Sequence, residues 1–410
     1  MSFFSIRQAL AALMVAVLVS ACGGSGNSSA PPPTGGIVVT PGDGTATITW
    51  TATPGVKYWL FYAPASTISS NDWINVPGSR AILDVTSPYV LTGLANGYTY
   101  SFTVNGRNGD GPGGPGSPSV STVPRPAGGT WYTGGALGTN TLRSLSYGTS
   151  TDLLGYYFAV GDAGSTYRST DGVSWTALPA AANANLNAAT FALSKFIVVG
   201  SGGSISYGTD MTTWTAAASN TTENLNALAS NGTIVVAVGN NGTVRSSADG
   251  VTWTTVSVPT SRNLYGIAYS GNGLWLAVGA GGTLLTSTDA TTWTAAASGT
   301  TADLRSVAVQ AITTYIYVAT GDNGTIVRST DSAGVTWSAQ TSGTTANLLA
   351  VSPSTSQFLA VGSGGAVLTS PDGTTWTTRD SGTTASLQSV LFGFSRYVAV
   401  GQGGISRNSQ

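Results

Sequence analysis

The side chains that most often carry out chemistry in proteins are scarce in this 410-residue sequence. It has no histidine, and Glu223 is its only glutamate. Histidine is the commonest general base and metal ligand near neutral pH, and glutamate supplies much of the usual carboxylate chemistry. The single cysteine, Cys22, rules out an intramolecular disulfide framework. We therefore expect no enzyme activity, no catalytic constellation, no cofactor and no metal site.

The cysteine follows a segment that is typical of export. Arg7 precedes an apolar run from Ala9 to Val19, which suits the core of a signal peptide but is too short for a stable membrane span. The run ends in Leu-Val-Ser-Ala-Cys22, which resembles the lipobox of bacterial lipoproteins. The resemblance implies cleavage after residue 21 and acylation of Cys22, which would anchor the chain in a membrane.

The residue after the cysteine and the overall charge bear on location and partners. Gly23, in place of aspartate, favours the outer membrane by resemblance to sorted lipoproteins. Residues 22–36 are rich in Gly, Ser and Pro and are expected to form a tether. Only 8% of residues are charged and the net charge is −1, which makes nucleic acid a poor candidate partner.

Aspartates recur in a fixed setting along the second part of the chain. The pattern is Ser-x-Asp-x-x-x-Trp, and it resembles the Asp-box (BNR) repeat. A short carboxylate or hydroxyl in a tight turn accepts backbone N–H bonds, so we assign these aspartates to the fold and not to catalysis. The copies are Ser169/Asp171/Trp175, Ser247/Asp249/Trp253, Ser287/Asp289/Trp293 and Ser370/Asp372/Trp376, with degraded copies at Asp210/Trp214 and Ser329/Asp331/Trp337.

The elements that carry these turns repeat seven times over residues 130–410. A strand-ending glycine recurs every 39 to 42 residues, at Gly161, Gly200, Gly239, Gly279, Gly321, Gly362 and Gly401. Units of this period with four short strands each predict a seven-bladed β-propeller. The seventh unit reaches Gln410 before its tryptophan strand. We expect the segment around Trp131 and Tyr132 to supply that strand and close the ring.

Residues 37–124 predict a smaller all-β unit, a sandwich of short alternating strands. Ile48 and Trp50 fall on one strand face. The segment resembles a fibronectin type III domain, in which Trp50 matches the core tryptophan and Leu94 with Tyr100 matches the tyrosine corner. The predicted fold class is therefore all-β, with a fibronectin type III-like sandwich followed by the propeller.

Positions that break the repeat are the best candidates for a binding site, because the fold does not require them to differ. One set directly follows the leucine of each unit and is expected to line the channel, where it could grip an acidic or carbohydrate group. It consists of Arg143, Asn187, Asn226, Tyr265, Arg305, Leu349 and Gln388. A second set precedes the Asp-box turns and consists of Arg168, Arg245 and Arg328. A solvated face is the alternative for both.

Two other groups of acidic residues resemble sites but have plainer roles. Asp162 and Asp322 lie in Gly-Asp-x-Gly turns, where calcium binding is conceivable but plain turn formation is the commoner role. Glu223 lies in a variable connection between repeats, and we expect it to be solvated and not catalytic.

The repeat text Ser-Gly-Thr-Thr-x-x-Leu, Ala-Val-Gly-x-x-Gly and Asp-Gly-x-x-Trp most resembles the propeller of photosystem II assembly/stability factors. This resemblance implies a protein-binding or assembly role, so we expect a non-catalytic scaffold lipoprotein of the cell envelope. The alternative is a surface protein that binds or hydrolyses polysaccharide. Exposed aromatic side chains around Tyr265 and Trp275 would favour that alternative.

Overall fold

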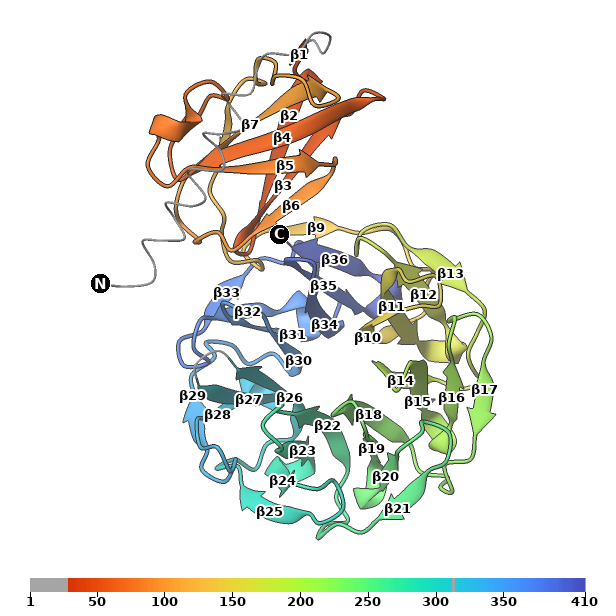
Figure 1. Ribbon diagram of the computed structural model, residues 1–410. Coiled ribbons are helices and arrows are strands. Elements are labelled where there is room, and N and C mark those ends of the chain that lie inside the picture. Colours follow the sequence, from red (N-terminus) through yellow and green to blue (C-terminus); the bar gives the residue numbers. More distant parts are fainter. Residues whose placement is uncertain (1–28, 312–313, 410) are drawn as a thin grey trace, which may run out of the picture. The chain divides into compact units, whose positions relative to one another are not determined.

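The computed structural model describes residues 29–311 and 314–409, and the chain divides into two compact units at Arg125/Pro126. Both units are built from β-strands joined by turns and short 3₁₀ segments (Figure 1). Among the described residues, no helix has the length and apolar character needed to cross a membrane. The expected signal peptide and Cys22 lie outside the described residues.

The first unit is a sandwich of two antiparallel sheets. Strands β2 (Thr34–Gly42), β3 (Thr45–Thr51) and β6 (Tyr89–Thr92) form one sheet. The other sheet has the order β1-β7-β4-β5, with β8 also paired to β7. Its strands are β1 (Ser29–Ala30), β4 (Val56–Ala63), β5 (Arg80–Val85), β7 (Tyr100–Asn108) and β8 (Val120–Thr122), and a 3₁₀ turn η1 (Trp73–Asn75) precedes β5.

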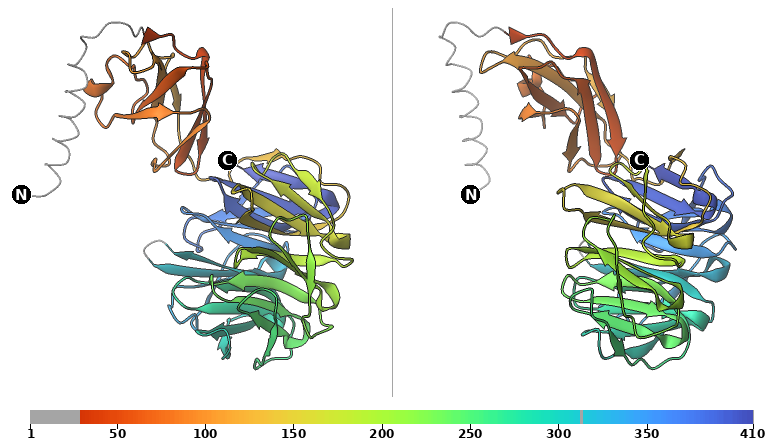
Figure 2. Two further views of the ribbon diagram at one scale, coloured as in Figure 1. Left: turned by 45° about the vertical axis from the view of Figure 1, so that its right-hand side comes forward. Right: turned by 90° about the vertical axis from the view of Figure 1, so that its right-hand side faces the viewer.

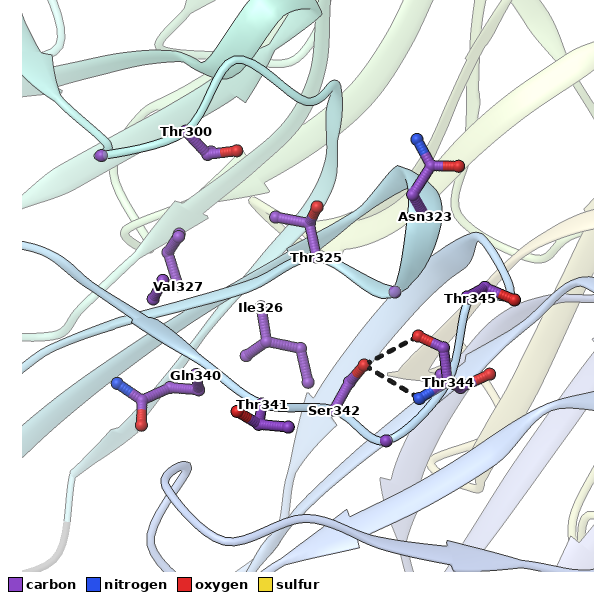
Figure 3. Close-up of a pocket in the computed structure, with 14 residues that line it drawn as sticks. Thr300, Asn323, Thr325, Ile326, Val327, Gln340, Thr341, Ser342, Thr344 and Thr345 are labelled. Atoms are coloured by element: carbon purple, nitrogen blue, oxygen red, sulfur yellow. Dashed lines mark hydrogen bonds between the residues drawn. The ribbon is translucent and has the colours of Figure 1, made fainter.

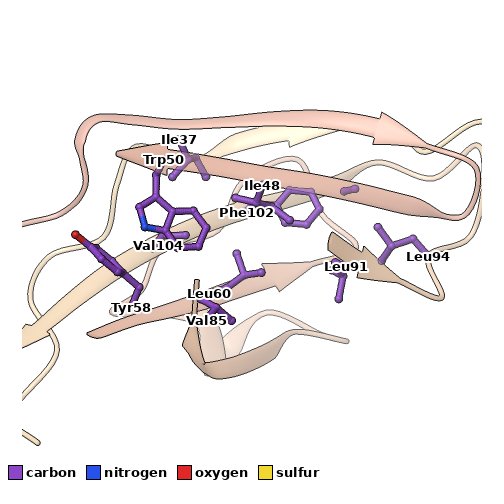
Figure 4. Packing of buried hydrophobic residues seen from close by; sticks show 11 residues of the cluster. Ile37, Ile48, Trp50, Tyr58, Leu60, Val85, Leu91, Leu94, Phe102 and Val104 are labelled. Atoms are coloured by element: carbon purple, nitrogen blue, oxygen red, sulfur yellow. The ribbon is translucent and has the colours of Figure 1, made fainter. Parts of the chain in front are cut away.

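The sandwich core consists of the apolar residues that alternate along these strands (Figure 4). Trp50 packs edge-on against Tyr58, with ring centroids 5.5 Å apart. Leu94 is buried, and the Tyr100 hydroxyl accepts a hydrogen bond from the Ala95 N–H at 3.2 Å. The indole and the tyrosine corner expected from the sequence therefore both lie where a fibronectin type III domain has them.

The sandwich begins earlier than the sequence suggested. Ser29 and Ala30 pair with β7, and Ala30 is buried. A Cβ on Gly106 would collide with the Pro31 carbonyl oxygen, so the incoming chain lies tightly on the sheet. The expected tether over residues 22–36 is therefore corrected: residues 29–36 belong to the folded unit, because the open edge of β7 gives Ser29 and Ala30 a backbone partner.

The second unit is a β-propeller, and its described residues form seven four-stranded antiparallel sheets (Figure 1). In six sheets the strand order follows the chain. Their strands are β10 (Leu142–Thr149), β11 (Gly155–Gly161), β12 (Thr166–Ser169) and β13 (Thr176–Leu178); β14 (Leu186–Ala192), β15 (Lys195–Gly200), β16 (Ile205–Gly208) and β17 (Thr215–Ala217); β18 (Leu225–Ser230), β19 (Val235–Gly239), β20 (Val244–Ser247) and β21 (Thr254–Val256); β22 (Leu264–Tyr269), β23 (Trp275–Gly279), β24 (Thr283–Ser287) and β25 (Thr294–Ala297); β26 (Leu304–Ala311), β27 (Tyr315–Gly321), β28 (Ile326–Ser329) and β29 (Ser338–Gln340); and β30 (Leu348–Pro353), β31 (Phe358–Gly362), β32 (Val367–Ser370) and β33 (Thr377–Arg379).

The seventh sheet joins distant parts of the chain. Strands β34 (Leu387–Gly393), β35 (Arg396–Gly401) and β36 (Ser406–Ser409) are followed by β9 (Trp131–Thr133), which pairs antiparallel with β36. Trp131 is buried among residues that include Leu359 and Tyr397. This sheet also contacts the first one, where the Leu145 N–H donates to the Ser389 hydroxyl at 3.1 Å.

A tight turn after the second strand of each sheet packs against the connection that leads to the neighbouring sheet. These turns are the 3₁₀ segments η2 to η8, which begin at Asp162, Ser201, Asn240, Ala280, Asp322, Ser363 and Gln402. In the fourth sheet, Gly282 has φ +72°, and a Cβ there would collide with the Thr300 carbonyl oxygen. At Gly404, in the seventh sheet, a Cβ would collide with the Gly138 carbonyl oxygen ahead of the first sheet.

The Ser-x-Asp segments form the turns between third and fourth strands. In the fourth sheet, the Asp289 carboxylate accepts N–H bonds from Thr291 at 2.8 Å and Thr292 at 2.7 Å. The Ser287 hydroxyl donates to Asp289 at 3.1 Å and accepts the Ala290 N–H at 3.0 Å. Asp171, Asp210, Asp249, Asp331 and Asp372 also accept backbone N–H bonds within their turns. These aspartates therefore serve the fold.

The strand β9 generates a stability prediction. We expect Trp131→Ala to lower the free energy of unfolding by about 3–5 kcal/mol, because it removes a buried indole from the seventh sheet. Tyr132→Ala, at the adjacent and 48% exposed position of the same strand, is the matched control and should change stability little. Urea denaturation followed by tryptophan fluorescence measures both. Equal effects of the two substitutions would contradict the role given to Trp131.

The aspartate turns generate a prediction about pH. The Thr213 and Thr212 N–H groups lower the pKa of Asp210 to about 2, whereas an unfolded aspartate has a pKa of about 3.9. The Thr252 and Val251 N–H groups lower the pKa of Asp249 in the same way. A carboxylate whose pKa is lower in the folded state stabilises the fold above its unfolded pKa, and this contribution disappears as the pH falls through the folded pKa.

We therefore expect the urea midpoint to be lower at about pH 2 than above about pH 4. Asp210→Asn keeps an oxygen acceptor but cannot titrate, so its midpoint should fall less over the same interval. Midpoints that do not change with pH, or that fall equally in the variant, would contradict this account.

Candidate functional site

The first strands of the seven sheets surround the centre of the propeller (Figure 1). One cavity of about 260 Å³ lies at the ends where these strands begin. It gathers all seven repeat-breaking positions that follow the leucines. The lining residues are Arg143, Asn187, Asn226, Tyr265, Arg305, Asp322, Asn347, Leu349 and Gln388. The structure thus brings the first predicted residue set together in one place, while its role in binding stays a prediction.

A β-bulge at the start of each first strand explains why these side chains share a direction. In the fourth sheet Leu264 pairs with Gly279 and Gly266 pairs with Val278, so Tyr265 is the extra, unpaired residue. The same register shift occurs after the leucine in all seven sheets. A bulge re-aims the side chain of the unpaired residue. Here it turns one residue per sheet away from the pleat and toward the cavity.

The two cations of the cavity are already paired with carboxylates. Arg143 Nε lies 2.6 Å from Asp162 Oδ1. Arg305 donates through Nε and Nη2 to both oxygens of Asp322, at 2.8 and 2.6 Å, and Nη2 lies 3.3 Å from Asp303. The hydrogen bond to Asp322 raises the pKa of Arg305. The ring is mostly polar with two cations, as the sequence suggested, but the Asp162 and Asp322 carboxylates turn to the arginines and offset their charge.

Two of the three asparagines that line the cavity, Asn187 and Asn226, link neighbouring sheets. Asn187 Nδ2 donates to the Leu225 carbonyl at 3.0 Å, and Asn226 Nδ2 donates to the Leu264 carbonyl at 2.8 Å. Asn226 Nδ2 also lies 2.9 Å from Asn240 Oδ1. Asn226 thus engages both of its amide N–H groups and offers a ligand its amide oxygen, whereas Asn187 uses one of its two N–H groups in this way.

Tyr265 lines the cavity and is half-buried, whereas Trp275 pairs with Tyr269 toward the other end of the fourth sheet. The guanidinium carbon of Arg305 lies 4.5 Å from the ring centroid of Tyr265, a cation–π contact. Trp275 is 1% exposed and belongs to the core between the third and fourth sheets. The exposed aromatic surface around Tyr265 and Trp275 that would have favoured glycan stacking is therefore not found there.

The second candidate set, the arginines that precede Asp-box turns, is dispersed. Arg245 is buried and donates to the carbonyls of Ser219, Asn220 and Val244. Arg328 Nε donates to the Asp372 carbonyl at 2.8 Å, and the Arg168 guanidinium lies over the Tyr156 ring. Each of these arginines is engaged in contacts within the propeller, and none of them lines the central cavity.

A larger, shallow cavity of about 770 Å³ lies in the fifth sheet and its flanking connections (Figure 3). Its lining is uncharged and includes Thr300, Thr325, Gln340 and Ser342, whose hydroxyl donates to the Thr344 carbonyl at 3.1 Å. Sequence reasoning missed this cavity, because its residues belong to the repeated Ser-Gly-Thr-Thr connections and carry no distinctive chemistry. Within the described residues, no three His, Cys, Asp or Glu side chains lie close enough together to hold a metal ion.

Comparison with known families and solved structures agrees with the two-unit architecture. Residues 31–123 match the fibronectin type III domain family, and residues 279–390 match the DUF6242 beta propeller domain. No curated protein matches the chain significantly.

Similar solved structures include "YCF48 bound to D1 peptide", with 17% identity, a TM-score of 0.55, and coverage of 68% of this chain and 94% of that one. YCF48 from Cyanidioschyzon merolae has 16% identity, a TM-score of 0.54, and coverage of 68% and 98%. The WD40 propeller domain of Doa1 has 11% identity, a TM-score of 0.54, and coverage of 69% and 97%. At these identities the likeness concerns the fold alone. The chain thus combines a fibronectin type III domain with a β-propeller.

Proposed function

We propose that this protein is a non-catalytic scaffold that binds a protein partner through the central cavity of its propeller. The observation that carries the proposal is the convergence of seven non-repeating side chains on one cavity. The repeat gives every sheet the same backbone conformation. The side chains at these seven positions differ from sheet to sheet and can therefore be used to bind a ligand. The fold likeness to a YCF48 structure with a bound peptide is compatible with such a role.

Arg143 is the residue best placed to contact the partner. Its ion pair with Asp162 uses Nε, which leaves the two terminal nitrogens for a ligand, and its side chain is 38% exposed. A guanidinium fork of this kind suits a carboxylate on the partner. Arg305 is less able to bind the partner, because its Nε and Nη2 groups donate to Asp322 and its guanidinium lies over the Tyr265 ring.

In this function the propeller is a closed seven-bladed ring with Asp-box turns. Pairing of β9 with β36 and the hydrogen bond from the Leu137 N–H to the Gly404 carbonyl support closure. A closed ring holds the cavity residues at fixed positions without any disulfide. It also leaves no long unpaired strand edge between the first and seventh blades.

We further propose that the chain is a lipoprotein of the cell envelope, anchored through acylated Cys22 and sorted to the outer membrane. The lipobox-like segment ending at Cys22 and the following Gly23 support this location. In this arrangement the fibronectin type III domain spaces the propeller from the membrane or adds a second binding surface.

The test is capture of envelope proteins from detergent extracts with the whole chain as bait. We expect Arg143→Gln to lose most of the partner, because the free guanidinium fork is removed. Arg379→Gln is the matched control, since Arg379 lies on the outer strand β33 and outside the cavity. Both baits should keep the parent's thermal melting temperature.

Equal capture by both variants would overturn the assignment of the central cavity as the binding site. Retention of polysaccharide in place of protein would overturn the scaffold function and favour the glycan-binding alternative.

A further inference from the structure

Bulky apolar residues occupy the hairpin tips of three adjacent sheets, at the ends of the first strands remote from the central cavity. We call Tyr147, Leu153, Leu154, Leu193 and Phe394 the apolar tip surface. Leu153 is 84% exposed, Phe394 is 57% exposed and Leu154 is 53% exposed. They belong to the hairpins β10–β11, β14–β15 and β34–β35, whose sheets lie side by side (Figure 1).

The tips of these three hairpins form a continuous part of one end face of the propeller. The rings of Tyr147 and Phe394, from the first and seventh sheets, meet edge-to-face with centroids 5.2 Å apart. A Cβ on Gly148 of the first sheet would collide with Phe191 of the second, so these two hairpins also touch. Figure 2 shows the propeller from the side, with its two end faces in profile.

The most exposed of these residues, Leu153 and Leu154, add little to the core, whereas Leu193 is half-buried against a core cluster and Phe394 packs on the buried Tyr157 ring. Leu153, Leu193 and Phe394 have φ values of 64°, 53° and 46°, in the left-handed region that bulky side chains rarely adopt. The corresponding tips of the third and fourth sheets are polar and use Gly232, Gly271 and Gly273, which suit such turns. Leu153 and Phe394 are apolar residues at strained and exposed tips, which points to a role outside folding.

Basic residues flank the apolar tips in a repeated order. Leu193-Ser194-Lys195 and Phe394-Ser395-Arg396 both place a cation two residues after the apolar side chain. Lys195 Nζ makes one long contact, 3.5 Å to the Leu193 carbonyl, and Arg396 uses Nη1 for the Asp171 carbonyl at 3.0 Å. The nearby Asp152 is engaged by the Tyr156 hydroxyl and the Leu154 N–H. The cations thus remain available beside the tips.

We propose that the apolar tip surface docks on an anionic lipid surface. Leucine and phenylalanine tips enter the region between headgroups and acyl chains, while Lys195 and Arg396 lie at the level of the phosphates. Separate protruding tips do not form a groove that would fit one rigid partner. A fluid lipid surface can adapt to them and matches the charge of their flanks, so it is favoured over a second copy of the chain.

The experiment uses the full chain in a Cys22→Ser background, so that one introduced cysteine carries an environment-sensitive dye. Leu153→Cys places the dye at a tip, and Thr301→Cys places it in a connection on the cavity side as the control. We expect a blue shift of the tip dye with vesicles of phosphatidylcholine and phosphatidylglycerol, and none from the control dye. Residues 1–28 are common to both chains, so recruitment through them would not favour the tip dye.

Charge substitutions test the electrostatic part. Lys195→Gln should weaken vesicle binding by about fivefold at low salt. Lys57→Gln, the same change in the other unit, should leave binding unaltered. The proposal is overturned if the tip dye does not shift, or if both dyes shift equally. It is also overturned if pure phosphatidylcholine vesicles bind as well as the anionic ones. A vesicle-independent shift that grows with protein concentration would overturn it in favour of self-association.

Discussion

The structure of the propeller depends on the close approach between one turn of each sheet and the connection beside it. Glycines such as Gly282 and Gly404 let a left-handed turn approach a neighbouring carbonyl so closely that any side chain would collide with it. An asparagine or aspartate adds a second link at five of these junctions. Asp303 accepts the Gly281 N–H at 2.8 Å, and Asn224 accepts the Gly202 N–H at 2.9 Å. Backbone contacts of this kind set the spacing of the sheets, which explains how a chain with few charges and no disulfide framework keeps seven sheets in register.

That constraint also determines where variation is tolerated. The strand-end glycine, the turn glycine and the leucine are needed at every junction, and the Ser-x-Asp turns use their carboxylates locally. The bulged residue after the leucine is unpaired in the strand register, so its side chain can differ between sheets, although Asn187 and Asn226 use theirs to bond the neighbouring sheet. The most varied side-chain types of the repeat therefore occur at this bulged position. Arginine occurs where the same sheet offers an aspartate, as in Arg143 with Asp162 and Arg305 with Asp322.

The two ends of the first strands have opposite character. At the cavity end, ion pairs, amides and one tyrosine face a confined space, which favours a ligand with several polar groups. At the hairpin end, leucine and aromatic side chains stand exposed beside lysine and arginine. One short strand in each of these sheets therefore connects two surfaces of different chemistry.

The sequence alone determined what depends on local pattern. Local patterns predicted both units. The alternation of Ile48 and Trp50 predicted the sandwich, and the glycine period and the repeated Ser-x-Asp turns predicted the propeller, because each pattern depends on residues that are close together in the sequence. The tertiary structure decided what depends on residues far apart. It showed that bulges turn Tyr265 and its counterparts into one cavity, that Asp162 and Asp322 neutralise the arginines, and that residues 29–36 join the sandwich. It also brought Phe394 against Tyr147, 247 residues earlier in the chain. The repeat predicted that the strand at Trp131 joins the last sheet, but these side-chain contacts arise from the packing of separate strands, which no local pattern records.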